Sequence, residues 1–234
     1  KACSIIETDD AKNLACYDST NEKLNNLTEH MWVGLSLSIC ALNNKIGPIG
    51  VNTCVDFRRL VHPQSRVSNS MTNFFGVVNI VAKNFNDPTL TVSDISKQFR
   101  RHFNYIINSD AIFYNYLFPI DMHKDNTPVA HLSNIGPIKY KYPIKDFEIT
   151  LNLNQKAAQD VAQIVTYSKL KTDNVGKKVQ SNVIHYQFAY SPKIINAEIG
   201  KKIFESFHYF MRNVQPSTLI IDAFHELKQF QSKL

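Results

Sequence analysis

The 234-residue sequence predicts a single domain, residues 1–234, of the mixed α/β (α+β) class, with helices covering one face of a sheet. Two apolar patterns predict this class: some segments alternate every second residue, as strands do, and others have the 3.6-residue period of helices. A third observation is that no linker, long internal repeat or low-complexity tract divides the chain. A chain of this length can bury enough surface to be stable without a disulfide or a metal ion.

The first quarter of the chain is predicted to contain two strands and one helix. Residues 3–7 form a short strand. Residues 28–42 place apolar side chains on every face of a helix, which predicts a helix that is buried on all sides. The sequence GPIG at 47–50 is expected to end this region. Residues 51–57 then alternate as a strand does.

The second quarter is predicted to contain a central strand and an amphipathic helix. Residues 73–82 are almost continuously apolar, which is typical of a strand covered on both faces. Residues 92–106 carry apolar side chains at steps of 3, 4, 4 and 3, with Ser93 as the expected N-cap. Residues 110–118 are expected to form a short helix before Pro119.

The third quarter is predicted to contain further strands. Residues 129–133 form a strand that NIGP at 134–137 is expected to end. Residues 147–153 alternate apolar and polar side chains, which is typical of a half-exposed strand. Residues 157–167 fit either a helix or a strand, and DNVG at 173–176 predicts a turn.

The last quarter predicts a long strand at 179–190 followed by two helices. Ser191-Pro192 is expected to begin the first helix and Pro216-Ser217 the second. The side chains expected to face the core are Ile195, Ile199, Ile203, Phe207 and Phe210 in the first, and Ile220, Ala223, Phe224 and Leu227 in the second.

Composition and motifs exclude several classes of function. Only 7 of the 234 residues are glycine, and the sequence contains no G-x-x-x-x-G-K-[ST], G-x-G-x-x-G or G-x-S-x-G motif. The eight histidines are dispersed and form no H-E-x-x-H motif, so no metal site is predicted. The formal charge of +6 comes from dispersed lysines, which does not predict specific nucleic-acid binding.

Four cysteines, at positions 3, 16, 40 and 54, are expected to be buried free thiols in a reduced compartment. The most apolar run, residues 31–42, is shorter than the roughly 20 residues that cross a bilayer, and no signal peptide is visible. A cytoplasmic protein with no transmembrane segment is therefore expected, unless a targeting segment has been removed.

A few polar residues stand out as candidates for chemistry. The sequence DMHKD at 121–125 offers carboxylates and an imidazole, although its polar surroundings predict an exposed loop. His131 lies in a predicted strand, two residues before Ser133, and is a candidate pocket residue. His208 and His225 fall between apolar helix positions and are expected to be packing or surface residues.

Three segments resemble a known superfamily. The sequence VNTCVDFRRL at 51–60, followed by NFFG at 73–76, resembles the V-D-x-R-R … N-x-x-G stretch in the second half of chloramphenicol-acetyltransferase-like proteins. The sequence SNIG at 133–136 is similar to their S-N-x-G segment. This superfamily includes condensation domains of peptide synthetases, polyketide-associated acyltransferases and fungal alcohol O-acetyltransferases.

The resemblance implies a fold and an activity. Members have two similar halves, each a mixed, mostly antiparallel sheet covered by helices, which meet at a cleft with a central tunnel. Over nearly its whole length, this chain resembles the C-terminal half alone. The implied reaction moves an acyl group from a thioester donor, acyl-CoA or an acyl-carrier protein, to a small-molecule alcohol or amine. No bound cofactor is implied.

The sequence departs from the family at the general base. Family members carry a His-His-x-x-x-Asp motif in their first half, and its second histidine deprotonates the acceptor. This chain has no His-His pair, and Asp56-Phe57 is followed by Arg58 instead of the Gly-Trp of the plant branch. The resemblance therefore implies that an N-terminal half-domain, on another chain or in a missing segment, supplies the base. It assigns no catalytic residue to this chain, which is expected to be inactive alone.

The resemblance also implies roles for individual residues. Ser133, Asn134 and His131 are expected to face the tunnel and bind substrate, although Ser133 and Asn134 would alternatively end a strand and begin a turn. Asp56 and Arg58 share one face of a strand and are expected to form an internal ion pair. The other residues with an expected structural role are Asn73, Gly76 and Gly136.

Two functions of other classes stay open. A non-catalytic interaction or carrier-binding module that kept the fold would have a polar, self-sufficient surface, whereas a half-enzyme would expose apolar surface on its cleft face. A basic lipid- or nucleic-acid-binding protein would need a contiguous face of lysine and arginine.

Overall fold

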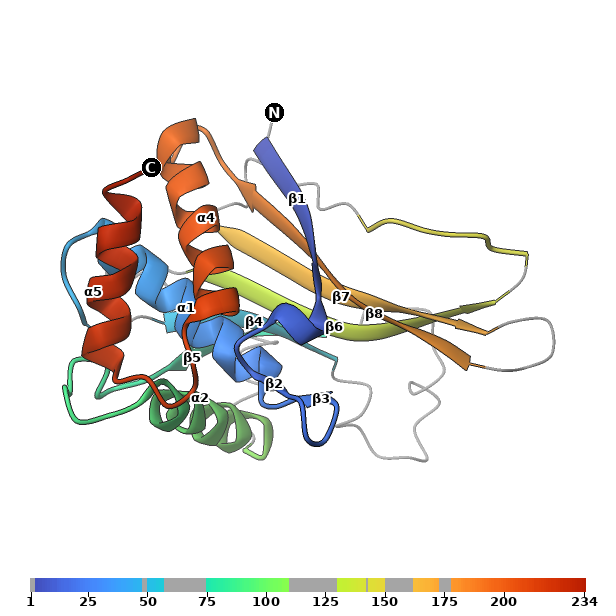
Figure 1. Cartoon of the computed structure of the whole chain (residues 1–234), viewed down its shortest axis with the longest axis horizontal. Helices are drawn as coiled ribbons and strands as arrows, with labels where there is room; N and C mark the ends of the chain where they lie inside the picture. The colour runs from blue at the N-terminus through green and yellow to red at the C-terminus, as the bar shows by residue number, and fades with distance from the viewer. Residues whose placement is uncertain are drawn as a thin grey trace.

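Figure 1 shows a computed structural model of the protein, in which helices pack against one face of a six-stranded sheet. The structure describes residues 3–47, 50–56, 75–109, 130–141, 143–149, 162–172 and 178–234. The strands are β1 (Cys3–Asp10), β2 (Tyr17–Asp18), β3 (Lys23–Leu24), β4 (Gly50–Asp56), β5 (Phe75–Val81), β6 (Ala130–Lys141), β7 (Gln163–Thr172) and β8 (Lys178–Tyr190). The helices are α1 (Leu27–Leu42), α2 (Val92–Ile107), α4 (Ala197–Asn213) and α5 (Ile220–Gln231), with a 3₁₀ turn at Ala11–Asn13.

The sheet is mixed and mostly antiparallel, as predicted. Its strand order is β1-β8-β7-β6-β4-β5. The outer pairs β1/β8, β8/β7 and β4/β5 are antiparallel, and β6 runs parallel to both of its neighbours at the centre. Strands β6, β7 and β8 extend beyond the helical layer, toward the right of Figure 1. The short β2/β3 hairpin forms a separate ribbon.

Helix α1 lies at the centre of the helical layer and is buried on nearly all sides, which confirms the prediction for residues 28–42. It contacts the other three helices and the central strands β4 and β6. Gly34 lies where α4 crosses α1, and a Cβ atom at this position would come 2.5 Å from Cδ1 of Phe210. The absence of a side chain therefore sets how closely the two helices approach.

Helix α2 matches its predicted span, but the predicted cap was wrong by two residues. The N-cap is Thr91, whose Oγ1 accepts a hydrogen bond from the backbone N–H of Asp94 at 3.2 Å. The Asp94 carboxylate accepts the N–H of Thr91 in return, also at 3.2 Å. This reciprocal pair is a capping box, and it satisfies two backbone donors, whereas Ser93 lies inside the helix.

The last two helices begin later than predicted. Helix α4 begins at Ala197 because Asn196 is its cap, with Oδ1 accepting from the N–H of Ile199 at 2.8 Å. Ile195, expected on the inner face of this helix, precedes it, and α5 begins at Ile220 instead of Pro216. Ile199 is half-buried, and the apolar positions from Ile203 onward in both helices are buried as predicted.

Strand β6 continues through the NIGP sequence that was expected to end it. The strand runs to Lys141 because a β-bulge between Asn134 and Gly136 shifts the register with β7, and the pairing continues beyond it. Gly136 has φ of +75°, a conformation that glycine adopts without strain.

Other local predictions had mixed outcomes. Residues 147–149 do not form a strand, and β7 begins at Gln163, which makes the end of the ambiguous segment 157–167 a strand. The predicted helix at 110–118, the candidate residues 121–125, residues 150–153 and the turn at 173–176 lie outside the described residues.

Strand β1 is attached to α4 by a buried carboxylate. Asp9 accepts hydrogen bonds from Nε2 of His208 at 2.7 Å and from Nε of Arg212 at 2.6 Å. Burial raises the pKa of Asp9, but the hydrogen bonds from these two residues outweigh it and hold the pKa below its usual value. These contacts join residues about 200 positions apart in the chain.

Within the described part of the chain, no helix has the length and apolarity needed to cross a membrane.

A candidate acyl-transfer site on the open face of the sheet

The face of the sheet opposite α1, here called the open face, carries polar side chains at its centre. Alternate residues of β6 face away from α1, so His131 and Ser133 lie together on the open face. Asn52 on β4 and Gln187 on β8 share this face, since their neighbours Val51 and Phe188 belong to the helix-covered core. The polar side chains are nonetheless little exposed: 4% for Asn52, 8% for Ser133 and 1% for Gln187. No described helix lies on this face.

Cys54 joins His131 and Ser133 in a compact cluster. Its Sγ atom lies 3.5 Å from Nε2 of His131, and the same nitrogen lies 2.9 Å from Oγ of Ser133. The backbone N–H of Cys54 donates to Oγ of Ser133 at 3.3 Å. The parallel pairing of β4 with β6 produces this arrangement, because it sets Asn52 opposite His131 and so brings Cys54 beside Ser133.

The arrangement has a definite chemical capacity. The oxygen of Ser133 accepts the Cys54 N–H and also lies within hydrogen-bond distance of the imidazole, where the histidine tautomer decides which group donates. In the tautomer with Nε2 unprotonated, this nitrogen can accept a proton from either the hydroxyl or the thiol. A basic nitrogen within reach of a thiol and a hydroxyl is the geometry of nucleophile activation.

Cys54 was missed in the sequence, and the expectation that all four cysteines are buried was wrong. Cys16 and Cys40 are buried, and burial raises their pKa values to about 12 and about 11. Cys3 is half-buried, and Cys54 is exposed. The signal was present: Val51 and Thr53 face the core, so the alternation of the strand predicts that Cys54 faces the other way.

Asn134 is not brought together with the other two residues expected to bind substrate. Its side chain lies on the helix-covered side, where Nδ2 donates to Oγ1 of Thr28 at 2.9 Å. Its Oδ1 accepts from Oγ1 of Thr166 and from the N–H of Gly136, both at 3.1 Å. The contacts of Asn134 therefore attach β6 to α1 and β7 at the bulge.

The residues expected to have structural roles are partly described. Asp56 is the last residue of β4, and Gly76 lies in β5 opposite Val55. Arg58 and Asn73 lie outside the described residues, so the ion pair expected between Asp56 and Arg58 stays a prediction.

Beyond the cluster, the open face continues into aromatic side chains. Tyr167 on β7 stacks on His185 on β8, with ring centroids 4.8 Å apart and planes at 8°. Phe147 stacks on the same tyrosine at 5.9 Å, so residues 143–149 pack against this end of the face. Lys169 pairs with Asp146 at 2.8 Å beside them. Burial and the nearby Lys169 charge lower the pKa of His185.

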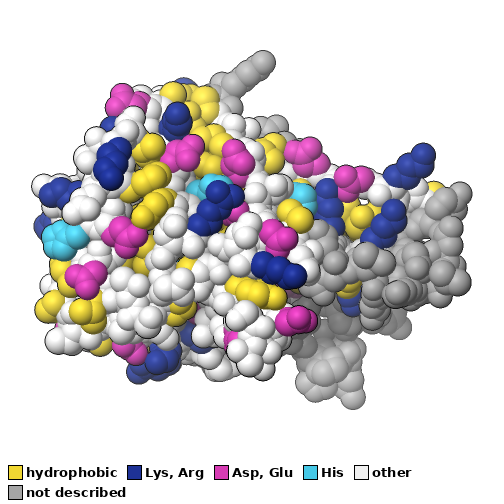
Figure 2. Space-filling view, viewed as in Figure 1, with side chains coloured by type: hydrophobic (Ala, Val, Ile, Leu, Met, Phe, Trp, Pro, Cys, Tyr) yellow, Lys and Arg dark blue, Asp and Glu magenta, His cyan; other side chains and the backbone are white. Residues whose placement is uncertain are grey.

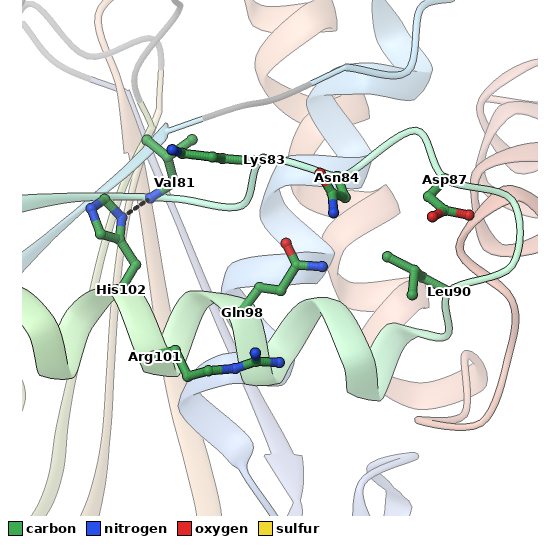
Figure 3. Close-up of a pocket in the computed structure, with 8 residues that line it drawn as sticks. All are labelled: Val81, Lys83, Asn84, Asp87, Leu90, Gln98, Arg101 and His102. Atoms are coloured by element: carbon green, nitrogen blue, oxygen red, sulfur yellow. Dashed lines mark hydrogen bonds between the residues drawn. The ribbon is translucent and has the colours of Figure 1, made fainter.

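Apart from the cluster on β4 and β6, a cavity of about 530 Å³ lies between α2 and the segment after β5. Figure 3 shows Lys83 and Asp87 on that segment, with Arg101 and His102 on α2. The backbone N–H of Val81 donates to Nδ1 of His102 at 2.9 Å. Burial, partly offset by this bond, lowers the pKa of His102, so at neutral pH its proton is on Nε2. Among the described residues that line this cavity, none has a thiol or hydroxyl, and none belongs to the cluster on β4 and β6.

The charged side chains on one face of the molecule are mixed in sign: on the face shown in Figure 2, basic and acidic side chains are interspersed. Across the described residues, no three His, Cys, Asp or Glu side chains are grouped so that they could hold a metal ion.

The sheet order and the helices on one face define the class of fold: the chain has the fold of about half of a condensation-type domain. No protein-family model matches the sequence, and no curated protein matches it. The fold that the resemblance implied is therefore confirmed by solved structures and not by sequence relatives.

Three solved structures illustrate the similarity. The structure of holo T3CT has a TM-score of 0.57 and 8% identity, over 93% of this chain and 47% of that one. The epimerization domain from the third module of tyrocidine synthetase B has a TM-score of 0.52 and 9% identity, over 97% and 49%. The starter condensation domain of rhizomide synthetase has a TM-score of 0.54 and 10% identity, over 94% and 48%. The chain thus spans about half the length of the structures it matches.

Proposed function

We propose that this chain is the C-terminal half of an acyltransferase that moves an acyl group from a thioester donor to a small-molecule alcohol or amine. The observation that carries the proposal is the match of nearly the whole chain to about half of each condensation-type structure. The missing half of such a fold would lie against a face that this chain leaves without described helices. The open face is such a face, although its centre is polar and little exposed and not the exposed apolar surface expected of a half-enzyme.

His131 and Ser133 are the residues we propose to hold the substrate. A hydroxyl or imidazole donor aimed at the developing oxyanion accelerates acyl transfer by on the order of 10²–10³. Asn134 is left out of this role, since its amide is engaged on the helix-covered side. Its proposed contribution is indirect: it holds the bulge that follows Ser133.

The complementary N-terminal half would supply the His-His-x-x-x-Asp base for the acceptor. The donor would be acyl-CoA or an acyl-carrier protein, with no bound cofactor. We place the activity in the cytoplasm, where the cysteines would remain thiols.

The test is an acyl-transfer assay with acetyl-CoA and longer acyl-CoA donors against a panel of alcohols and amines. It is run on this chain alone and then with a complementary half that carries the motif. Turnover that needs both halves, and that falls at least tenfold in Ser133→Ala, supports the proposal. A carrier protein that binds without any transfer, with either half or both, would replace it with the non-catalytic carrier-binding module.

A further inference from the structure

We infer that Cys54 is a nucleophile that accepts the acyl group from the thioester donor, with His131 as the base that removes its proton. The inference rests on the proposed function, which supplies an acyl thioester as substrate. It adds a covalent S-acyl intermediate, formed on this half of the enzyme before the acceptor reacts.

The geometry of a nucleophile and its base is present. The Sγ of Cys54 lies 3.5 Å from Nε2 of His131, which is hydrogen-bond distance for sulfur. Both side chains project from neighbouring parallel strands of the sheet, so the backbone ladder holds their separation. The thiol is exposed and the imidazole half-buried, so a donor can reach the sulfur while the base is partly shielded from water.

Ser133 is the third member of the cluster and acts as a positioning residue. Its Oγ lies 2.9 Å from Nε2 of His131 and also accepts the N–H of Cys54 at 3.3 Å. Ser133 and Cys54 therefore share the same nitrogen of His131, and the contact with Ser133 keeps Nε2 near the thiol.

Accessibility distinguishes the two candidate nucleophiles of the cluster. The hydroxyl of Ser133 lies closer to the imidazole, but Ser133 is only 8% exposed, which leaves less room for attack by its oxygen than for a hydrogen bond. Cys54 is exposed, and a thiolate is a better nucleophile than a serine hydroxyl. The buried Cys16 and Cys40 have raised pKa values and stay protonated.

The step balances without any further reactant. Nε2 of His131 takes the thiol proton, and the thiolate of Cys54 attacks the carbonyl carbon of the donor thioester. The bond from that carbon to the donor sulfur breaks as the bond to Sγ forms. The leaving thiolate then takes the proton from His131. One thioester replaces another, so no oxidant, reductant or energy source is consumed.

The test measures acylation of the isolated chain by intact-mass spectrometry after incubation with acetyl-CoA near pH 7, with peptide mapping of the site. We expect one acetyl group per chain on Cys54, released by neutral hydroxylamine as thioesters are. Cys54→Ala should abolish the adduct, and His131→Ala should slow its formation at least tenfold. The matched control Cys3→Ser, at a half-buried cysteine outside the cluster, should acylate as the wild type does.

A second measurement separates chemistry from folding. The pH dependence of Cys54 alkylation by iodoacetamide should move to higher pH in His131→Ala, and by less in Ser133→Ala, while the thermal unfolding midpoints stay close to wild type. An acetylation rate no faster than that of free N-acetylcysteine, or one unchanged in His131→Ala, would overturn the inference.

Failure of the inference can be told apart from failure of the proposed function. If both halves together transfer acyl groups at the wild-type rate with Cys54→Ala, the proposed function stands and the covalent intermediate is wrong. If Cys54 is acylated but no acceptor is ever modified with both halves present, the thiol chemistry stands and the proposed acyltransferase function is wrong.

Discussion

Asn134 joins three parts of the fold through one side-chain amide. Its two ends bind Thr28 at the start of α1, Thr166 on β7 and the backbone of Gly136 across the bulge. Adjacent residues of a strand point to opposite faces, so Ser133 and Asn134 of the motif have different roles. Ser133 belongs to the open face, and Asn134 belongs to the scaffold beneath it.

We expect Asn134→Ala to lower the free energy of unfolding by about 2 kcal/mol, because it removes three hydrogen bonds and leaves the Thr166 hydroxyl without this acceptor. Urea unfolding measures the loss. The control is Asn213→Ala, at an exposed side chain that bonds only to the Tyr209 carbonyl, where a loss below about 1 kcal/mol is expected. Equal losses in the two variants would contradict the role assigned to Asn134.

His30 in α1 is a buried imidazole whose charge the fold excludes. Burial lowers its pKa to about 4, and its ring packs on Phe210 with centroids 4.7 Å apart. The unfolded chain, with an ordinary histidine pKa of 6.5, binds the proton more tightly than the folded chain. Stability that is fully present above pH 6.5 is therefore lost as the pH falls toward 4.

Because of this difference in pKa, the free energy of unfolding falls by about 3 kcal/mol between pH 7 and pH 4. We expect His30→Phe, which keeps a ring against Phe210, to lose less stability over this range than the wild type, as measured by urea unfolding at several pH values. The exposed His225→Phe should keep the wild-type slope. Parallel curves for wild type and His30→Phe would show that this imidazole is not the titrating group.

At the scale of elements, the crossing of α1 and α4 depends on one missing side chain. Gly34→Ala improves helix propensity by up to about 1 kcal/mol but places a methyl group 2.5 Å from the Phe210 ring, where overpacking costs about 1–3 kcal/mol. We expect a net loss of stability in thermal unfolding. Gly47→Ala is the matched control, since a Cβ there meets nothing within 4 Å, and it should be nearly neutral. A more stable Gly34→Ala protein would mean that the helices can separate without cost.

The elements also show what could be predicted from sequence. The apolar run of α1 and the helical period of α2 were sufficient to predict these two helices. The local sequence pattern identifies a helix that is wholly buried or strongly amphipathic. The length of β6 was not predictable, since NIGP has the composition of a turn and its continuation depends on pairing with β7 through a bulge. The starts of α4 and α5 were placed too early because proline marks a boundary only approximately.

The candidate site was also predictable only in part, because local pattern identifies residues of one strand but not their partners on another. His131 and Ser133 could be found from one strand, since two residues of one strand share a face. Their partner Cys54 lies 77 positions from His131 in the chain, and only the parallel pairing of β4 with β6 brings it there. The register in which β4 pairs with β6 cannot be predicted from the local sequence pattern of either strand.

At the scale of the molecule, one face of the sheet is covered by helices and the other face is polar. The helices fill one face with a continuous apolar core, and the other face keeps Asn52, Ser133 and Gln187 away from solvent among polar neighbours. The length of about half the matching structures supports the proposed active site shared with a second half, whereas the polar open face is the surface expected of the alternative, a self-sufficient module.

The most direct test of this claim is a titration of the chain with the complementary half at fixed acyl-CoA and acceptor, with the rate of acceptor acylation as the readout. We predict no turnover at zero partner, beyond one acyl group taken up per chain, and a rate that rises and saturates at one partner per chain. Sustained turnover by the chain alone, removed by His131→Ala, would contradict the account, because the site would then be complete within this half.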